Sequence, residues 1–340
     1  MKNIIKTITL TSIVIICASC ANIDNSVAQV HSAPAINNKL KVLIVDGQNN
    51  HTVWPKSTIM MKQYMEESGL FSVDVYRTKP TWKGSRHPEY YALHSDSSNV
   101  DGKKPKVDTD FNPNFNGYDV IVSNFGFRTA NWPNKTQESF ETYMANGGGF
   151  VAVHAANNAF PKWKAFNQMT GVGGWGGRNE KSGPHLYYND KGELITDTSK
   201  GKGGTHGKIH ELQITKRVEH PILAGLPNVW MHTKDECYGK LRGPAENFTI
   251  IATALCPKDQ KGTGNHEPML MTINYDKGRI FNTTLGHEDY SFESVGFITT
   301  LLRGVEWAAT GKVTQAVPSD FPTEKKSSKR AFNYKELKVQ

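Results

Sequence analysis

The sequence predicts an α/β protein, a three-layer sandwich in which helices cover both faces of a mostly parallel sheet. Short apolar runs rich in β-branched residues, typical of buried strands, occur at Lys39–Val45, Tyr118–Asn124 and Phe150–Val153. Helical segments at Pro55–Ser68 and Lys135–Asn146 separate these runs. Strands that alternate with helices indicate a parallel sheet, because each crossover helix must pack on a face of the sheet.

The rest of the first half fits this pattern. Pro55 suits the first turn of the first helix, and Gly69 ends that helix. Alternating residues at Phe71–Tyr76 predict a second strand. Residues 78–117 are rich in Pro, Lys, Asp, Asn and Ser, so we expect a long insertion with little regular structure. Three glycines, 147–149, end the second helix.

The second half is less regular. Residues 171–207 are glycine-rich and polar, which predicts a long loop or a small lobe. Met269–Tyr275 and Arg279–Thr284 are expected to pair as a hairpin across the turn at 276–278. The remaining expected elements are strands at Ile209–Ile214 and Phe248–Leu255, and a helix at Phe292–Ala309 that ends before Gly311.

The N-terminus has the pattern of a bacterial export signal. Lys2 and Lys6 precede the apolar run Ile8–Ile16, which is shorter than the about 20 residues that a membrane-spanning helix needs. The run ends in Cys17-Ala18-Ser19-Cys20, which resembles a lipobox. We therefore expect a lipid anchor on Cys20, and hence a membrane-anchored protein that faces the periplasm or the cell surface. The alternative is a plain secretory signal that is cleaved nearby.

This organisation predicts four parts of the chain. They are a signal peptide at 1–20, a tether at 21–38, a domain at 39–311 and a basic tail at 312–340. We expect the tail to be solvated or to rest on an anionic membrane surface. Truncation after Phe321 should then change the melting temperature little.

The positive charge is concentrated at the two ends of the chain. Of the net charge of +8, Lys2 and Lys6 contribute +2 and residues 324–340 contribute +4, which leaves +2 for residues 20–323. A nucleic-acid-binding surface needs a basic stripe, and the body has none in sequence. We therefore expect no nucleic-acid partner.

Two cysteines, Cys237 and Cys256, lie beyond the signal. In an oxidising compartment they could form a disulfide. They could equally be small buried apolar residues. Because a domain of about 300 residues can build its own core, we favour unpaired cysteines.

Polar residues that follow the predicted strands are the first candidates for a site, because open parallel sheets place their sites at the carboxyl ends of the strands. His154 follows the strand at 150–153, and His287 follows the strand at 279–284. The candidates after the first strand are Gln48, Asn49, Asn50 and His51.

Two further clusters could bind a metal or transfer protons. His206 and His210 lie four residues apart beside Glu211, and they could hold a divalent metal such as zinc. Asp235 and Glu236 are adjacent carboxylates that could act as general acid or base, or as metal ligands. An exposed turn with salt bridges is the alternative for the second cluster.

Several motifs occur in an order that resembles one protein family. They are DGQNNH at 46–51, GFVAVHAA at 149–156, GVGGWGGR at 171–178, THGKIHE at 205–211, HPI at 220–222, WMHTKDECY at 230–238, LRGP at 241–244 and KGRIFNTTLGH at 277–287. Over residues 40–311 this combination resembles the ThuA-like (trehalose utilisation) family. The resemblance implies a flavodoxin-like fold related to class I glutamine amidotransferases. It also implies a link to disaccharide or keto-sugar catabolism.

The resemblance to class I glutamine amidotransferases bears on the role of His154. In those enzymes a sharp turn after a strand presents a cysteine nucleophile, and here His154 stands at that position. Imidazole does not replace a thiolate, so ordinary amidotransferase chemistry is not expected. In the same frame the positions of His154 and His287 meet as nucleophile and base, so we expect both rings to face one pocket.

Our leading hypothesis is an exported enzyme that hydrolyses or isomerises a sugar or glycoside, such as trehalose, another disaccharide or a keto-glycoside. His154 and His287 would transfer protons, with Asp235 and Glu236 as acidic partners. The expected substrate-binding residues are Gln48, Asn49, Asn50, His51, Trp54 and Arg178. The alternative is a non-catalytic carbohydrate-binding lipoprotein, which would not need clustered titratable groups. The glycines at 171–177 follow a helix instead of a strand, so we expect no nicotinamide cofactor.

Overall fold

The computed structural model describes residues 39–94 and 99–335. The expected signal peptide, the tether and the lipid anchor on Cys20 lie outside these residues. Among the helices that the structure describes, none combines the length and apolarity needed to cross a bilayer.

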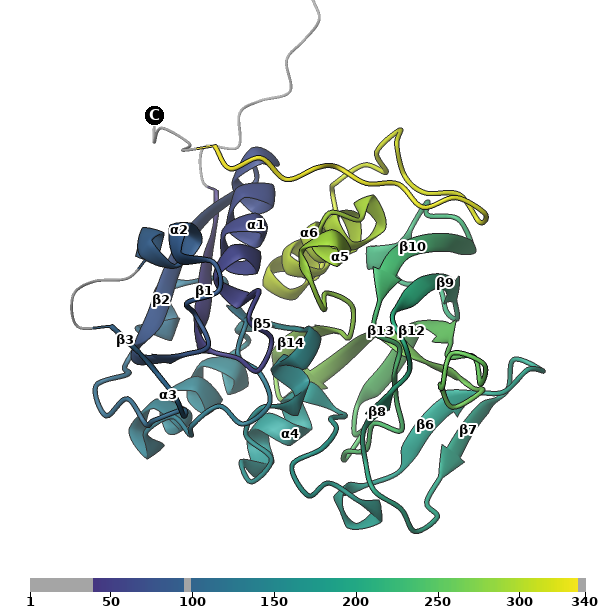
Figure 1. The fold of residues 1–340 in the computed structure, drawn as a ribbon, viewed down its shortest axis with the longest axis horizontal. Helices are drawn as coiled ribbons and strands as arrows, with labels where there is room; N and C mark the ends of the chain where they lie inside the picture. Colours follow the sequence, from purple (N-terminus) through teal and green to yellow (C-terminus); the bar gives the residue numbers. More distant parts are fainter. Residues whose placement is uncertain (1–38, 95–98, 336–340) are drawn as a thin grey trace, which may run out of the picture. The chain divides into compact units, whose positions relative to one another are not determined.

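One half of the central sheet is parallel (Figure 1). In spatial order its strands are β3 (Val100–Gly102), β2 (Phe71–Trp82), β1 (Leu40–Gln48), β4 (Val120–Ser123), β5 (Gly149–Val153) and β14 (Gly278–Thr283). All neighbours in this series run parallel. The carboxyl ends of these strands therefore lie along one edge of the sheet, as the predicted fold requires.

The other half of the sheet is antiparallel. It continues from β14 through β13 (His266–Tyr275), β12 (Phe248–Leu255), β9 (His210–Lys216) and β10 (Val229–Asp235). β6 (His185–Tyr188) pairs with β13, and β7 (Leu194–Asp197) pairs with β6. A separate ladder joins β8 (Thr205–His206) to β11 (Tyr238–Gly239). The segment 171–207, expected as a long loop or a small lobe, thus carries three short strands: β6 and β7 pair with each other as a hairpin, and β8 pairs with β11.

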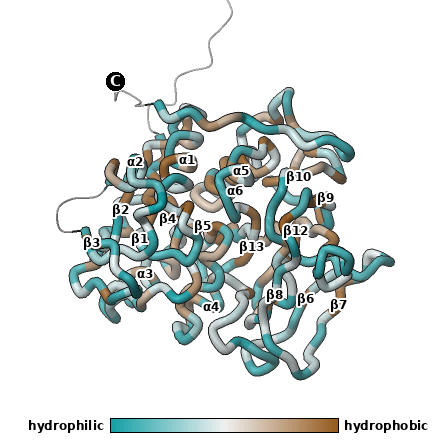
Figure 2. The backbone as a smooth tube through the Cα atoms, in the orientation of Figure 1, coloured by the Kyte–Doolittle hydropathy of each residue, from teal (hydrophilic) through white to brown (hydrophobic). Residues whose placement is uncertain are grey.

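Helices cover the two faces of the parallel half. Successive side chains of β1 point to opposite faces, so Val42 and Ile44 belong to one apolar core while Leu43 and Val45 belong to the other. The first core packs on α1 (Trp54–Glu67) and α6 (Val295–Thr310), and the second on α3 (Asn134–Ala145) and α4 (Lys164–Thr170). Figure 2 shows the apolar segments concentrated in the strands and in α6, with polar segments in the outer loops. The predicted three-layer arrangement is confirmed.

Local differences from the expected elements have simple causes. β2 continues to Trp82, and the insertion that follows contains the short α2 (Pro88–Tyr91) and pairs β3 with β2. The last helix is divided into α5 (Asp289–Phe292) and α6, because Ser294 adopts an extended conformation between them. The hairpin of β13 and β14 forms as predicted.

Cys237 and Cys256 form a disulfide, with their Cα atoms 5.6 Å apart, so the expectation that they are unpaired is wrong. Both residues are buried. Cys237 lies between β10 and β11, and Cys256 follows β12. The fold brings these segments together, and a separation of 19 residues in sequence does not by itself encode that proximity.

The C-terminal tail is anchored to the body, which corrects the expectation of a purely solvated end. Most of its polar side chains are exposed, but Val317, Phe321 and Phe332 pack against the core on the α1 and α6 side. In Figure 1 the tail, drawn in yellow, runs along that side of the domain. Three backbone hydrogen bonds secure it: Met231 N to Thr323 O at 2.8 Å, Val295 N to Ser328 O at 3.0 Å and Arg330 N to Glu293 O at 2.9 Å.

Candidate active site at the carboxyl edge of the parallel strands

Three histidines converge at the carboxyl edge of the parallel strands. His51 follows β1, His154 follows β5 and His287 follows β14. The ring centroid of His51 lies 4.7 Å from that of His154 and 4.8 Å from that of His287. The centroids of His154 and His287 are 5.7 Å apart, so these two rings lie close together, although neither lines the adjoining pocket.

His154 is held in one orientation and one tautomer. Its backbone adopts a φ of +49°, which is uncommon for a residue other than glycine and gives the sharp turn after β5. Its Nδ1 lies 2.7 Å from the carbonyl oxygen of Thr284. Because a carbonyl only accepts hydrogen bonds, Nδ1 carries the proton and Nε2 keeps its lone pair. The Tyr238 hydroxyl donates to that Nε2 at 2.9 Å.

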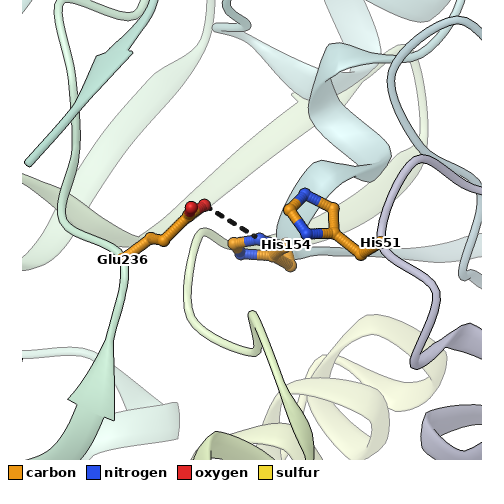
Figure 3. A group of neighbouring side chains, drawn as sticks. All are labelled: His51, His154 and Glu236. Carbon is orange, nitrogen blue, oxygen red and sulfur yellow. Dashed lines mark ion pairs between the residues drawn. The ribbon is translucent and has the colours of Figure 1, made fainter. Parts of the chain in front are cut away.

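Glu236 joins this group from the antiparallel half. One carboxylate oxygen lies 3.3 Å from His287 Nε2 and 3.4 Å from His206 Nδ1. The other lies 3.7 Å from His154 Nε2. Figure 3 shows the His154 ring between this carboxylate and the His51 ring. Glu236 thus contacts three imidazoles that come from separate parts of the chain.

Burial keeps the inner histidines neutral. It lowers the pKa of His154 to about 4, against the opposing effect of the Asp235 charge. Burial, followed by the charges of His154 and His287, holds the pKa of His51 well below its usual value. Burial also raises the pKa of the Glu236 carboxyl, although His287 and His206 act in the opposite direction. Neutral imidazoles with free lone pairs can ligate a metal at neutral pH.

Asp235 supports the site but does not line the pocket. This differs from the catalytic role that we expected for it. Its side chain is fully buried. It accepts four hydrogen bonds, from His232 Nε2 at 2.9 Å and from the backbone N–H groups of Glu236 at 2.8 Å, Gly286 at 2.8 Å and His287 at 3.0 Å. All of its oxygen lone pairs are directed at protein donors. Asp235 therefore fixes the two segments that present Glu236 and His287.

A pocket of about 160 Å³ opens above these groups. Its lining comprises Asn50, His51, Phe127, Asn158, Trp175, His206, Glu236 and Tyr238. The Trp175 ring lies 5.1 Å from that of Tyr238 and 6.1 Å from that of His206, so it forms one wall. Aromatic walls combined with polar groups that point at one spot are typical of small-molecule sites.

Comparison with known proteins identifies the family. A family model described as ThuA, trehalose utilisation, matches residues 41–308. The chain belongs to the ThuA family. The crystal structure of a ThuA-like protein from Parabacteroides merdae is 41% identical to it, with a TM-score of 0.75 over 86% of this chain and 98% of that one.

More distant matches share less. A ThuA-like protein from Bacteroides uniformis is 17% identical, with a TM-score of 0.48 over 83% of this chain and 97% of that one. A protein described as a GMP synthase component from Thermoplasma acidophilum is 10% identical, with a TM-score of 0.38 over 81% and 96% of the two chains. No curated protein matches the chain.

Several residues expected to bind substrate instead support the fold of this ThuA domain. Gln48 donates to the carbonyls of Pro80 and Lys106 and accepts from Ala130 N, and so ties three loops together. The Asn49 side chain accepts from His51 N and donates to the Asn124 and Phe125 carbonyls. Buried backbone groups of crossing loops need partners, and these amides supply them.

Trp54 and Arg178 also have structural roles. Trp54 is fully buried at the start of α1 and donates from its indole N–H to the Trp82 carbonyl. Arg178 donates to the carbonyls of Asn157, Asn158, Ala159 and Gly174 and to the Asn167 side chain. It therefore braces the turn after His154 against the loop that carries Trp175.

The remaining candidates divide between the pocket and its surroundings. Asn50 lines the pocket, and its side-chain oxygen accepts from Phe127 N. His206 lies at the rim with its side chain 47% exposed. His210, the expected partner of His206, does not line the pocket and contacts the Lys208 carbonyl through Nδ1. His206 and His210 belong to different strands, β8 and β9, which pair with different partners, and only His206 lines the pocket.

The pocket residues that were not among the predicted site residues are Phe127, Asn158, Trp175 and Tyr238. Tyr238 lies two positions after Glu236, a spacing that puts both side chains on one face of extended chain. This signal was present in the sequence. Trp175 and Phe127 lie in loops, and their convergence depends on the complete fold.

The residues present fit a divalent metal. One ring nitrogen each of His51 and His154 and one carboxylate oxygen of Glu236 lie within 4.8 Å of one another. Two histidines and a glutamate are one of the donor sets of catalytic zinc sites, which keep a position open for water or substrate. The hydrogen bond from His154 Nδ1 to a carbonyl is the supporting contact that metal-ligating histidines usually make.

Proposed function

We propose that this ThuA-family protein is an enzyme that hydrolyses or isomerises a disaccharide or keto-glycoside, and that His51, His154 and Glu236 bind a divalent metal such as zinc. The observation that carries the proposal is that donor atoms of these three residues lie within 4.8 Å of one another, and that His51 and Glu236 also line the pocket. The family description, trehalose utilisation, supports a saccharide as substrate.

The metal would polarise a carbonyl or hydroxyl oxygen and lower the pKa of a bound water. His287 is placed to move protons, because its Nε2 lies 3.3 Å from a carboxylate oxygen of Glu236 and its side chain is 14% exposed. Burial raises the pKa of the Tyr238 hydroxyl well above its usual value, so the hydroxyl stays protonated. A metal on His154 Nε2 would displace the hydrogen bond that Tyr238 donates to that atom, and would free the hydroxyl to donate to the substrate. Asn50 and Asn158 offer amide groups for sugar hydroxyls.

A non-catalytic carbohydrate-binding protein would need the amides and the aromatic wall. It would not need three imidazoles around one buried carboxylate. Titratable groups gathered in this way are typical of catalytic sites. We therefore favour an enzyme over a non-catalytic carbohydrate-binding protein.

Zinc titration and turnover test the proposal together. Protein stripped with EDTA is titrated with zinc chloride by calorimetry, and the release or conversion of sugar is then measured with trehalose and with keto-disaccharides. We expect one zinc per chain, and a loss of affinity of about 100-fold in His51→Ala, His154→Ala and Glu236→Ala. His210→Ala is the matched control and should bind zinc normally. Stoichiometric binding that survives Glu236→Ala, or zinc-loaded protein without turnover, would contradict the proposal.

We also propose that the protein is exported and anchored through Cys20. The disulfide between Cys237 and Cys256 supports an oxidising compartment. Cys20→Ala should move the protein from the membrane fraction to the soluble fraction. An unchanged distribution would contradict the anchor.

A further inference from the structure

A second hollow adjoins the histidine pocket. It measures about 590 Å³ and is lined by residues of three loops, at 127–128, 175–179 and 202–204. Phe127 and Trp175 line both the hollow and the pocket, and their ring centroids are 6.4 Å apart. A ligand that extends from the pocket past this aromatic pair would therefore enter the hollow.

The lining of the hollow is positively charged. It contains Arg128, Arg178 and Lys202, and its lining residues include no carboxylate. Arg178 is engaged with backbone carbonyls, whereas Arg128 and Lys202 are exposed and form no ion pair within the described part of the chain. Since residues 20–323 carry a net charge of only +2, this concentration of positive charge is local.

The aromatic wall is held rigidly. Trp175 adopts a φ of +52°, and its backbone N–H donates to the Gly203 carbonyl at 2.9 Å. Gly204, with a φ of +90°, lies so close that a Cβ there would be 2.6 Å from Trp175 N. Glycine is therefore required at 204 for the two loops to approach, and a wall fixed in advance lowers the entropic cost of binding a ligand.

We propose that the hollow is a second saccharide subsite and that it takes a sugar residue with a negative charge, carried by a carboxylate or a sulfate group. The sugar ring would pack on the Trp175 and Phe127 side, and its anionic group would reach Arg128 and Lys202. This inference rests on the proposed function, because the first pocket then holds the reacting sugar. Charge-assisted hydrogen bonds to guanidinium and ammonium groups supply the selectivity over neutral sugars.

Calorimetric titration of the metal-free protein tests the subsite with four probes: glucose, glucuronate, glucose 6-sulfate and inorganic sulfate. We expect at least one of the two anionic sugars to bind about tenfold more tightly than glucose. The double variant Arg128→Gln/Lys202→Gln should remove this difference. The matched control Lys208→Gln/Lys258→Gln, which changes two lysines outside the hollow, should retain it.

The outcomes separate the subsite from the proposed chemistry. The proposed subsite is refuted if glucose and both anionic sugars bind with equal affinity. It is also refuted if inorganic sulfate binds as tightly as the anionic sugars. The preference should persist in His154→Ala, because His154 lies outside the hollow. A protein that keeps the preference but turns over no glycoside refutes the proposed function alone. A protein that turns over neutral glycosides without the preference refutes the subsite alone.

Discussion

The two halves of the sheet supply the site in different ways. The parallel half contributes His51, His154 and His287, each directly after a strand. Parallel neighbours bring these strand ends to one edge, so the convergence of the three rings follows from topology.

The other side of the site comes from Glu236, which directly follows β10 of the antiparallel half, from Tyr238 in the short strand β11, and from Trp175 in the loop after α4. Two features position the first two: the hydrogen bonds of Asp235 and the disulfide at Cys237. No rule about strand ends applies here. The strand order of the sheet therefore positions the three histidines, whereas specific buried contacts position Glu236 and Tyr238.

We expect the largest effect from a change of Asp235, which supports residues of both halves of the site. Asp235→Asn should lower activity about 10- to 100-fold, because the amide cannot accept from all four donors and both Glu236 and His287 lose their support. It should also lower the free energy of unfolding by about 3 kcal/mol. Steady-state kinetics should show the loss mainly in kcat, and zinc affinity should fall with it.

Glu306→Gln is the matched control. The Glu306 carboxylate on α6 is also buried and accepts four hydrogen bonds, from the backbone and side chains of Thr314 and Gln315. We expect a similar loss of stability and unchanged kcat in the folded protein. Equal kinetic losses in the two variants would show that Asp235 acts only through stability.

Lowering the pH should lower the free energy of unfolding, because His154 in the parallel half is buried as a neutral imidazole. The folded-state pKa of His154 is lowered to about 4, so between pH 6.5 and pH 4 the unfolded chain binds a proton that the folded chain does not. Stability from this residue is present above pH 6.5 and is lost as the pH falls to 4, by about 3 kcal/mol. Urea unfolding of metal-free protein measures it. His154→Gln should reduce the slope of stability against pH, and an identical slope would contradict the buried neutral imidazole.

The disulfide should matter for the antiparallel half. Closing a loop between residues 19 apart stabilises a protein by about 3 kcal/mol in the chain-entropy model. Cys237→Ser/Cys256→Ser should lose about this much free energy of unfolding, and dithiothreitol should affect the wild type alone. Because Cys237 lies between Glu236 and Tyr238, we also expect weaker zinc binding. Full affinity in the folded double variant would show that the bridge does not position the site.

The sequence predicted the parts of the molecule that local patterns determine. The strands that precede His51, His154 and His287 are apolar runs, and the parallel arrangement of these strands brings the three rings together; proximity was expected only for His154 and His287. Glu236 was also chosen correctly as a pocket residue.

The errors concern side chains whose partners are distant in sequence. Gln48 and Arg178 are polar residues beside the expected site, and sequence alone does not show that backbone carbonyls occupy their donors. The Cys237–Cys256 pair and the pairings of β6 with β13 and of β8 with β11 likewise depend on partners that only the folded chain provides.

The smallest effect should come from the C-terminal tail, which lies across the α1 and α6 side of the parallel half. The Phe332 ring packs edge-on against that of Tyr64, with centroids 6.0 Å apart, and lies at the same distance from the Tyr90 ring. Phe332→Ala removes a partly buried aromatic side chain and should cost about 1–2 kcal/mol, less than a fully buried phenylalanine because solvent can fill the space.

Truncation after Phe321 should cost more than Phe332→Ala, since it also removes the backbone hydrogen bonds to Met231, Val295 and Glu293. Thermal unfolding monitored by circular dichroism compares the two, with Lys325→Ala, a change of an exposed tail side chain, as the control. Neither variant should change zinc affinity, because none of residues 322–335 lines the histidine pocket. A melting temperature unchanged by truncation would mean that the tail rests on the body without stabilising it. The sheet and its helices would then account for the stability of the parallel half without a contribution from the tail.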